Sequence, residues 1–132
     1  MTLRLISGVV AGTLVAFLCV FGIEALGHIV FPPPAGTDLT DPAQVARLMD
    51  LMPPAALAFV LAAWFLGTLA GAWVANAVAQ SGLAGWIVAL LVVAAGAYTM
   101  IMIAHPAWMW AAGLLLPLAA AWLAQRLTRR AG

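Results

Sequence analysis

Between Leu51 and Gln125 the sequence contains no Asp, Glu, Lys or Arg, a stretch of 75 residues. The whole chain of 132 residues is 67% hydrophobic and 7% charged, whereas ordinary soluble domains carry about 25% charged residues. So few charges cannot coat the surface of a soluble domain. They also exclude a disordered chain and a nucleic-acid binder that works through a basic face. We therefore expect an all-α integral membrane protein whose first partner is the lipid bilayer, with no nucleic-acid partner.

Four apolar segments of the sequence are long enough to cross a bilayer, which takes about 20 helical residues. They cover about residues 5–31, 55–79, 83–104 and 107–125. The turns between the last three are very short, so neighbouring helices should be antiparallel. We expect the first segment to be a retained helix, because its apolar run exceeds the ~7–15 residues of a signal peptide and no A-x-A cleavage site follows. The sequence thus predicts a single transmembrane domain over residues 1–132, an up-and-down bundle of four transmembrane helices.

The loop 32–54 between the first two spans opens with three prolines, which cannot continue a helix. Further along, Asp41 can cap a helix, Pro42 suits the first helical position, and Gln44 completes a capping box. Apolar residues then follow at helical spacing: Val45, Leu48, Met49 and Met52. This pattern predicts a short amphipathic helix on the extracytoplasmic surface of the membrane.

The arginines indicate the orientation of the chain. Arginines flank both termini, at Arg4, Arg126, Arg129 and Arg130. The loop 32–54 carries only Arg47, together with three aspartates. The positive-inside rule then predicts a multi-pass protein with both termini in the cytoplasm.

Small residues at four-residue spacing predict close contacts between helices. They are Gly8 and Gly12 in the first span, and Ala63, Gly67, Gly71 and Ala75 in the second. Two interpretations remain open, tight packing inside one bundle and a seam between two copies of the chain. At about 100° per residue, the face with Gly8 and Gly12 lies roughly opposite the face with Glu24 and His28. We therefore expect the first span to have partners on two sides.

Four polar side chains are predicted to share one layer near the outer end of the bundle. Glu24 and His28 are four residues apart on one face of the first span, and His105 lies at the turn before the last span. Tyr98 precedes His105 by two helical turns, on nearly the same face. Glu24 either has a structural role, such as bonding to His28, or is a protonatable or ligand-binding carboxylate. Trp64 is expected to pack in the core with its N–H bonded to a carbonyl group.

The same residues allow two cofactor hypotheses. Glu24, His28 and His105 are candidate metal ligands, since three protein ligands plus water form the catalytic zinc pattern, although their spacing is not diagnostic. A b-type haem between His28 and His105 is the second hypothesis. His105 is an awkward axial ligand, because it precedes a proline at a turn. The expectation that fits most of the sequence is that no cofactor is bound.

Three runs extend over most of the chain: Gly22-Ile23-Glu24-Ala25-Leu26-Gly27-His28, Pro32-Pro33-Pro34 and His105-Pro106-Ala107-Trp108. In these runs the sequence resembles an uncharacterised family of small bacterial four-span inner-membrane proteins. That resemblance implies a bacterial inner-membrane location and no particular activity. The chain is more weakly similar to the small multidrug resistance transporters, which use a Glu in the first of four spans to exchange protons for cationic drugs. It departs from them because Glu24 is near the end of its span and because their hairpins lack a loop like 32–54.

Three functions follow as hypotheses. The leading one is a non-enzymatic inner-membrane protein, an accessory or interaction subunit with a polar cluster near its outer surface, because little of the chain suggests chemistry. Its partner would be another membrane protein or a further copy of the chain. The first alternative is a small proton- or cation-coupled transporter that uses Glu24. The second is a metal- or haem-binding membrane enzyme.

Overall fold

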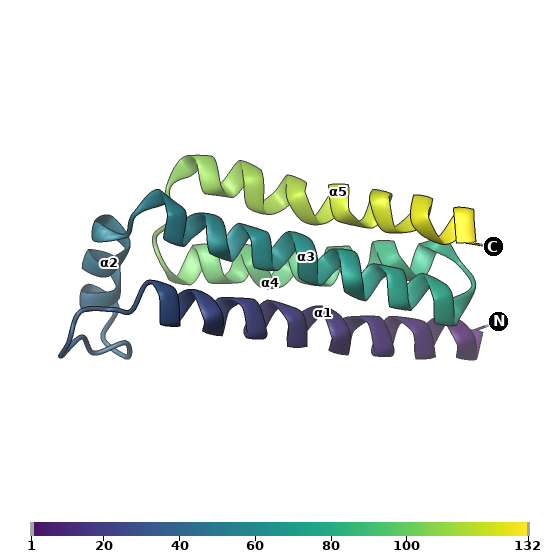
Figure 1. The fold of residues 1–132 in the computed structure, drawn as a ribbon, viewed down its shortest axis with the longest axis horizontal. Coiled ribbons are helices and arrows are strands. Elements are labelled where there is room, and N and C mark those ends of the chain that lie inside the picture. Colours follow the sequence, from purple (N-terminus) through teal and green to yellow (C-terminus); the bar gives the residue numbers. More distant parts are fainter. Residues whose placement is uncertain (1, 132) are drawn as a thin grey trace.

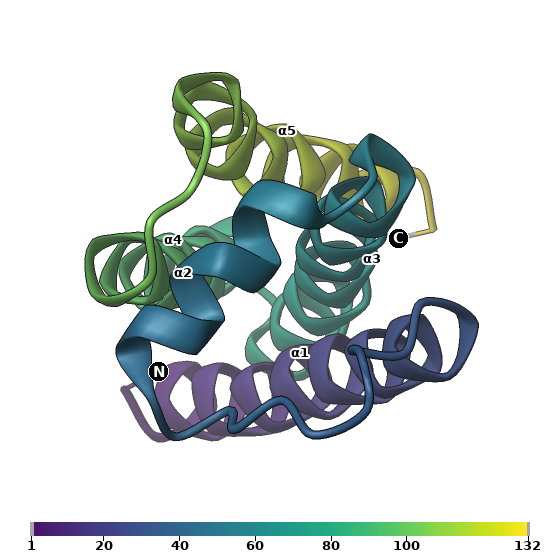
Figure 2. The same ribbon diagram turned by 90° about the vertical axis from the view of Figure 1, so that its left-hand side faces the viewer.

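The computed structural model describes residues 2–131 and contains, within that range, five helices and no strand (Figure 1). The helices are α1 (Thr2–Val30), α2 (Pro42–Leu51), α3 (Pro54–Ala79), α4 (Gly82–Met102) and α5 (Ala107–Ala131). The four long helices run up and down beside one another, and the short α2 crosses one end (Figures 1 and 2). Each long helix is long and apolar enough to cross a membrane. The predicted all-α, four-span bundle is confirmed, and the chain is a multi-pass membrane protein.

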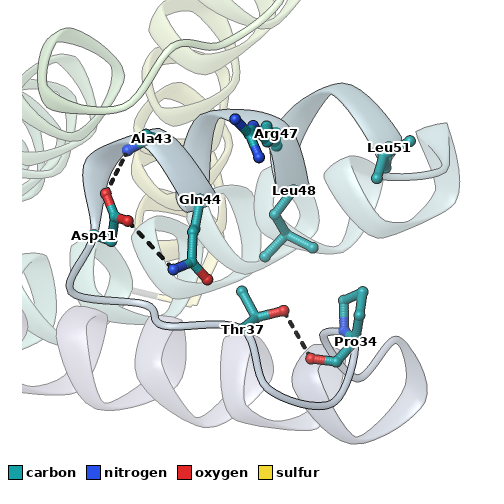
Figure 3. Close-up of a pocket in the computed structure, with 8 residues that line it drawn as sticks. All are labelled: Pro34, Thr37, Asp41, Ala43, Gln44, Arg47, Leu48 and Leu51. Atoms are coloured by element: carbon teal, nitrogen blue, oxygen red, sulfur yellow. Dashed lines mark hydrogen bonds between the residues drawn. The ribbon is translucent and has the colours of Figure 1, made fainter.

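The helix α2 begins with the predicted cap but without the predicted capping box. Asp41 accepts a hydrogen bond at 3.0 Å from the backbone N–H of Ala43, and its second oxygen accepts one from the Gln44 side chain (Figure 3). In a capping box, Gln44 would instead accept from the N–H of Asp41. That N–H already bonds to the carbonyl oxygen of Asp38, so the Gln44 oxygen accepts from the N–H of Asp38 at 2.8 Å. The start of α2 was therefore predicted correctly. The predicted hydrogen bond from the Asp41 N–H to the Gln44 side chain is not formed.

The turn between α3 and α4 is fixed by side chains from both helices. Gln80 ends α3 in the left-handed conformation, at φ 54°, and Ser81 caps α4 by accepting from the N–H of Leu83. The buried Asn76 accepts a hydrogen bond at 2.8 Å from the N–H of Gly85. A Cβ at Gly85 would lie 2.7 Å from that Asn76 oxygen, so this contact requires glycine. These contacts hold α3 and α4 as a close antiparallel pair.

The small residues named for close packing are all buried inside the bundle: Gly8, Gly12, Ala63, Gly67, Gly71 and Ala75. The two glycines of α1 lie against α3, which also contacts α4 and α5. A Cβ at Gly8 would lie 2.6 Å from the carbonyl oxygen of Ala75, and one at Gly12 would overlap the carbonyl oxygen of Gly71. These faces are therefore occupied within one chain, which leaves no room on them for a second copy.

The contact row on α1 advances by four residues at each step, from Gly8 through Gly12 toward Glu24. Four residues turn an α-helix through about 400°, which is about 40° beyond a full turn. A row of this kind winds around its helix, and two helices that pack along such rows cross each other. The glycine face and the Glu24 face consequently both contact α3, at different heights. We expected partners on two sides of the first span; both faces share the partner α3, and α1 also contacts α4.

Candidate functional site

A cavity of about 170 Å³ is lined by Met49 of α2 and by residues of α1, α3 and α4. The helix α2 crosses one end of the bundle (Figure 2). The lining of the cavity combines one carboxylate, two histidines and one hydroxyl with apolar side chains. The polar members are Glu24, His28, Thr99 and His105. Two methionines also line the cavity: Met49 belongs to α2, and Met52 directly follows α2. Both also pack against the buried core. The cavity is therefore lined by residues that are far apart in the sequence, from Glu24 to His105.

Glu24 is held in this cavity by a single hydrogen bond. The indole Nε1 of Trp64 donates to Oε1 of Glu24 at 3.1 Å. Trp64 is only 5% exposed and Glu24 is partly buried. Among residues 2–131, no group donates a hydrogen bond to Oε2 of Glu24. One carboxylate oxygen is thus fixed, and the other keeps its capacity to accept.

The ring of Trp64 is wedged between the helices opposite Glu24. A Cβ at Gly96 of α4 would lie 3.1 Å from the indole Cζ3, and one at Gly113 of α5 would lie 2.7 Å from it. The ring therefore requires a shift for any side chain at Gly113, and it fits tightly against Gly96. The ring therefore packs on α4 and α5 while its N–H bonds to α1. The orientation of the Glu24 carboxylate is consequently set by packing among all four long helices.

The structure brings three of the four predicted cluster residues to this cavity. Glu24, His28 and His105 line it together. His28 is exposed, whereas a ring nitrogen of His105 bonds to the carbonyl oxygen of Ile103. Glu24 bonds to Trp64 and not to His28. The predicted layer is therefore present for these three residues, with a different partner for the carboxylate.

Tyr98 lies outside the cavity and is 66% exposed. The prediction counted two helical turns from Tyr98 to His105. The helix α4 ends at Met102, and its last N–H bond is made by the capping Ile103, so helical spacing does not reach His105. Thr99 lines the cavity instead.

Three aromatic residues were not included in the predicted cluster, although they form its walls. Trp64 was expected to bond to a carbonyl group, and its partner is the Glu24 carboxylate. Phe31 and Phe59 pack edge to face with ring centroids 6.0 Å apart, and both line the cavity. A signal for Trp64 was present, because an indole N–H inside a span needs an acceptor and Glu24 is the one acidic residue within the four predicted spans. The two phenylalanines carry no such signal.

The donor set does not resemble a metal centre. Between Thr2 and Ala131, no three His, Cys, Asp or Glu side chains gather closely enough to hold a metal ion. Glu24, His28 and His105 line one cavity without converging on a common point. A carboxylate with one open oxygen, aromatic walls and two thioethers is instead suited to a cation with apolar substituents.

Comparisons with protein-family models, with curated proteins and with solved structures find no match to this chain. The interpretation of the site consequently depends on its own geometry.

Proposed function

We propose that this chain is a non-enzymatic accessory protein of the bacterial inner membrane that acts by binding a cationic group at Glu24. The observation that carries the proposal is the open Oε2 of Glu24 inside a cavity with aromatic walls. A partly buried carboxylate gains most from a cation that replaces its lost water. Phe31, Phe59 and Trp64 line the same cavity, and aromatic rings attract a cation that lies over them.

The size of the cavity favours one compact group as the occupant. Its volume of about 170 Å³ is below the roughly 300 to 1,000 Å³ of pockets for drug-sized ligands. A neighbouring cavity of about 340 Å³ shares His28, Phe31 and Met52 with it and is otherwise lined mainly by prolines and leucines. Together they suit an amphiphilic amine, with its head at Glu24 and its apolar tail along α2.

The proposed orientation in the membrane is supported by the charge distribution, and the proposed contact with lipid by exposed apolar side chains. The arginines near both ends of the chain support cytoplasmic termini, with α2 and the Glu24 cavity at the outer surface. Large apolar side chains point away from the bundle on three long helices, at Leu18, Leu90 and Leu115, and the lipid bilayer is their proposed partner. A homo-oligomer or a second membrane protein remains a prediction of the sequence.

Transport is the second candidate function, because a carboxylate inside a spanning helix often marks a proton or ion path. The packing below the cavity argues for binding without transport. There the seam between α1 and α3 is closed by backbone contact at Gly12 and Gly71. A transported cation would need this seam to open.

The proposal is tested by calorimetric titration of the purified chain in non-ionic detergent with hexyltrimethylammonium. The matched ligand is its neutral carbon isostere, 2,2-dimethyloctane. We expect the cation to bind and the isostere to show only micelle partitioning. Glu24→Gln keeps the shape of the side chain and should weaken cation binding by about tenfold or more.

Asp50→Asn is the matched control, because Asp50 is an exposed carboxylate on α2 outside the cavity. It should leave binding unchanged. Equal affinity for the cation and its isostere, or equal loss in both variants, would contradict the proposal. Movement of the cation across liposomes that depends on Glu24 would favour the transporter instead.

A further inference from the structure

The polar side chains that line the Glu24 cavity come from separate parts of the chain. Glu24 belongs to α1, Thr99 to α4, and His105 to the connection between α4 and α5. His28 also lines the cavity, but it is exposed and can bond to water. For the other three residues, bonds within the chain determine whether each side chain can still donate or only accept.

Thr99 uses its hydroxyl hydrogen inside its own helix. Its Oγ1 donates to the carbonyl oxygen of Ala95 at 3.0 Å. A hydroxyl group has one hydrogen and two lone pairs. While this bond is made, Thr99 can offer a ligand only an acceptor.

His105 is limited in the same way by its bond to the backbone. A carbonyl oxygen only accepts hydrogen bonds, so the Nδ1 that bonds to the Ile103 carbonyl must carry a hydrogen. In a neutral imidazole the second nitrogen is then an acceptor. Among residues 2–131, no group donates a hydrogen bond to this Nε2.

Glu24 adds a third acceptor. Its Oε1 already accepts from the indole N–H of Trp64, and its Oε2 has no donor within the described chain. An ionised carboxylate has no hydrogen to donate. Three segments of the chain thus supply acceptors to one cavity, and none of these three side chains keeps a hydrogen for a ligand. A ligand without N–H groups would leave these acceptors unpaired, which is unfavourable where water is excluded.

We propose that the cavity selects an alkylammonium ion that carries N–H groups, with a primary amine as the preferred class, over a quaternary ammonium of the same charge. This inference rests on the proposed function, because it requires a cation at Glu24. One N–H donates to Oε2 of Glu24, a bond that the opposite charge strengthens. The acceptors do not converge on one point, so the remaining N–H groups reach Thr99 and His105 directly or through a bridging water.

Calorimetric titration of the full chain in non-ionic detergent tests this selection. The probes are hexylammonium, dimethylhexylammonium and hexyltrimethylammonium, and each titration into protein-free micelles is subtracted. At about pH 7.5, where amines are protonated and a free imidazole is neutral, we expect hexylammonium to bind about tenfold more tightly than the quaternary ion. Dimethylhexylammonium keeps one N–H and should have an intermediate affinity.

The outcomes separate this inference from the proposed function. Equal affinity for the three probes, still weakened by Glu24→Gln, would overturn the selection and leave a cation site. Tighter binding of the quaternary ion would also overturn it and would assign recognition to the aromatic walls. Binding of none of the probes would overturn the proposed function together with the selection.

Two substitutions each remove one acceptor with little change in shape. Thr99→Val replaces the hydroxyl with a methyl group. His105→Asn can keep an N–H for the Ile103 carbonyl and removes Nε2. Each should lower the affinity for hexylammonium about threefold more than that for hexyltrimethylammonium. Equal losses for the two ions would mean that these side chains affect only packing, and would overturn their role in the selection.

Thr128→Val is the matched control for the hydroxyl. Thr128 makes the same kind of bond inside α5, to the carbonyl oxygen of Ala124 at 3.0 Å, and it does not line the Glu24 cavity. It should leave the affinities for both ions unchanged, whereas Thr99→Ser should restore the preference that Thr99→Val loses. A loss of preference in Thr128→Val equal to that in Thr99→Val would overturn the assignment to the cavity. Circular dichroism should give all variants the helix content of the parent.

Discussion

The indole Nε1 of Trp64 donates its hydrogen bond to Oε1 of Glu24 across 40 residues of sequence, at 3.1 Å. The ring that carries this N–H lies against Gly96 of α4 and Gly113 of α5. A change on any of the four long helices can therefore reorient one carboxylate. This relationship connects the stability of the bundle with the chemistry of its candidate site.

Trp64→Phe tests the contribution of this bond to stability. The phenyl ring keeps part of the packing and removes the N–H, so Oε1 of Glu24 loses its donor. We expect the free energy of unfolding to fall by about 1 kcal/mol or more. Thermal unfolding in detergent measures this change. Trp122→Phe, at an indole that is 50% exposed, should cost much less, and equal costs would deny the bond a structural role.

Glycine positions on α1 should differ sharply in their tolerance of alanine. A Cβ at Gly12 would overlap the Gly71 carbonyl oxygen, whereas one at Gly22 would meet nothing within 4 Å. Gly12→Ala should therefore lower the free energy of unfolding by about 1 to 3 kcal/mol. Gly22→Ala should be neutral or slightly stabilising, because alanine favours the helix. Unfolding in a denaturing detergent compares the two, and equal tolerance would mean that the α1–α3 seam is not as close as described.

The cap of α2 is expected to control the order of that helix. Asp41→Ala removes the acceptor for the Ala43 N–H, a loss that costs about 1 kcal/mol in typical helices. Amide hydrogen exchange over residues 42–51 should then become faster. Asp50→Ala removes a carboxylate near the other end of α2 and should leave this exchange unchanged or slower, since negative charge is unfavourable there. Similar acceleration in both variants would contradict the capping role.

The loop before α2 should respond to acid through Asp38. The hydroxyl and the backbone N–H of Thr40 both donate to Asp38, and these bonds lower the pKa of its carboxyl below the ordinary value of 3.8. A lowered pKa in the folded loop means that the bonds stabilise it above pH 3.8 and are lost as pH falls through the lower value. A nuclear magnetic resonance titration of the Thr40 amide should have its midpoint below 3.8. Thr40→Val should move the Asp38 midpoint upward, and an unchanged midpoint would exclude the hydroxyl as the cause.

The membrane-crossing part of the fold could be predicted because lipid forces the backbone to satisfy its own hydrogen bonds. The predicted span 55–79 differs by one residue from the observed α3, since prolines precede it and the left-handed Gln80 ends it. The last span was predicted to end at 125, and α5 continues to Ala131. Hydropathy marks the apolar part of a helix and not its charged extension, where arginines are favourable beside the C-terminus.

The candidate site could be predicted only in part. Topology alone brings Glu24, His28 and His105 to the same end of the bundle, and they line one cavity. The Trp64 contact depends on how α3 is rotated about its axis relative to α1, which sequence spacing does not determine. The position of Tyr98 was inferred by extending a helix past its actual end.

The order of synthesis has a consequence for α2. Met49 and Met52 are made before α3 and α4, yet the core and cavity that they contact include Leu57 of α3 and Thr99 of α4. Within the described chain, the backbone of α2 makes no close approach to another helix, so α2 contacts the bundle through side chains such as Met49. The apolar face of α2 can therefore reach its full set of contacts only after α3 and α4 have joined the bundle.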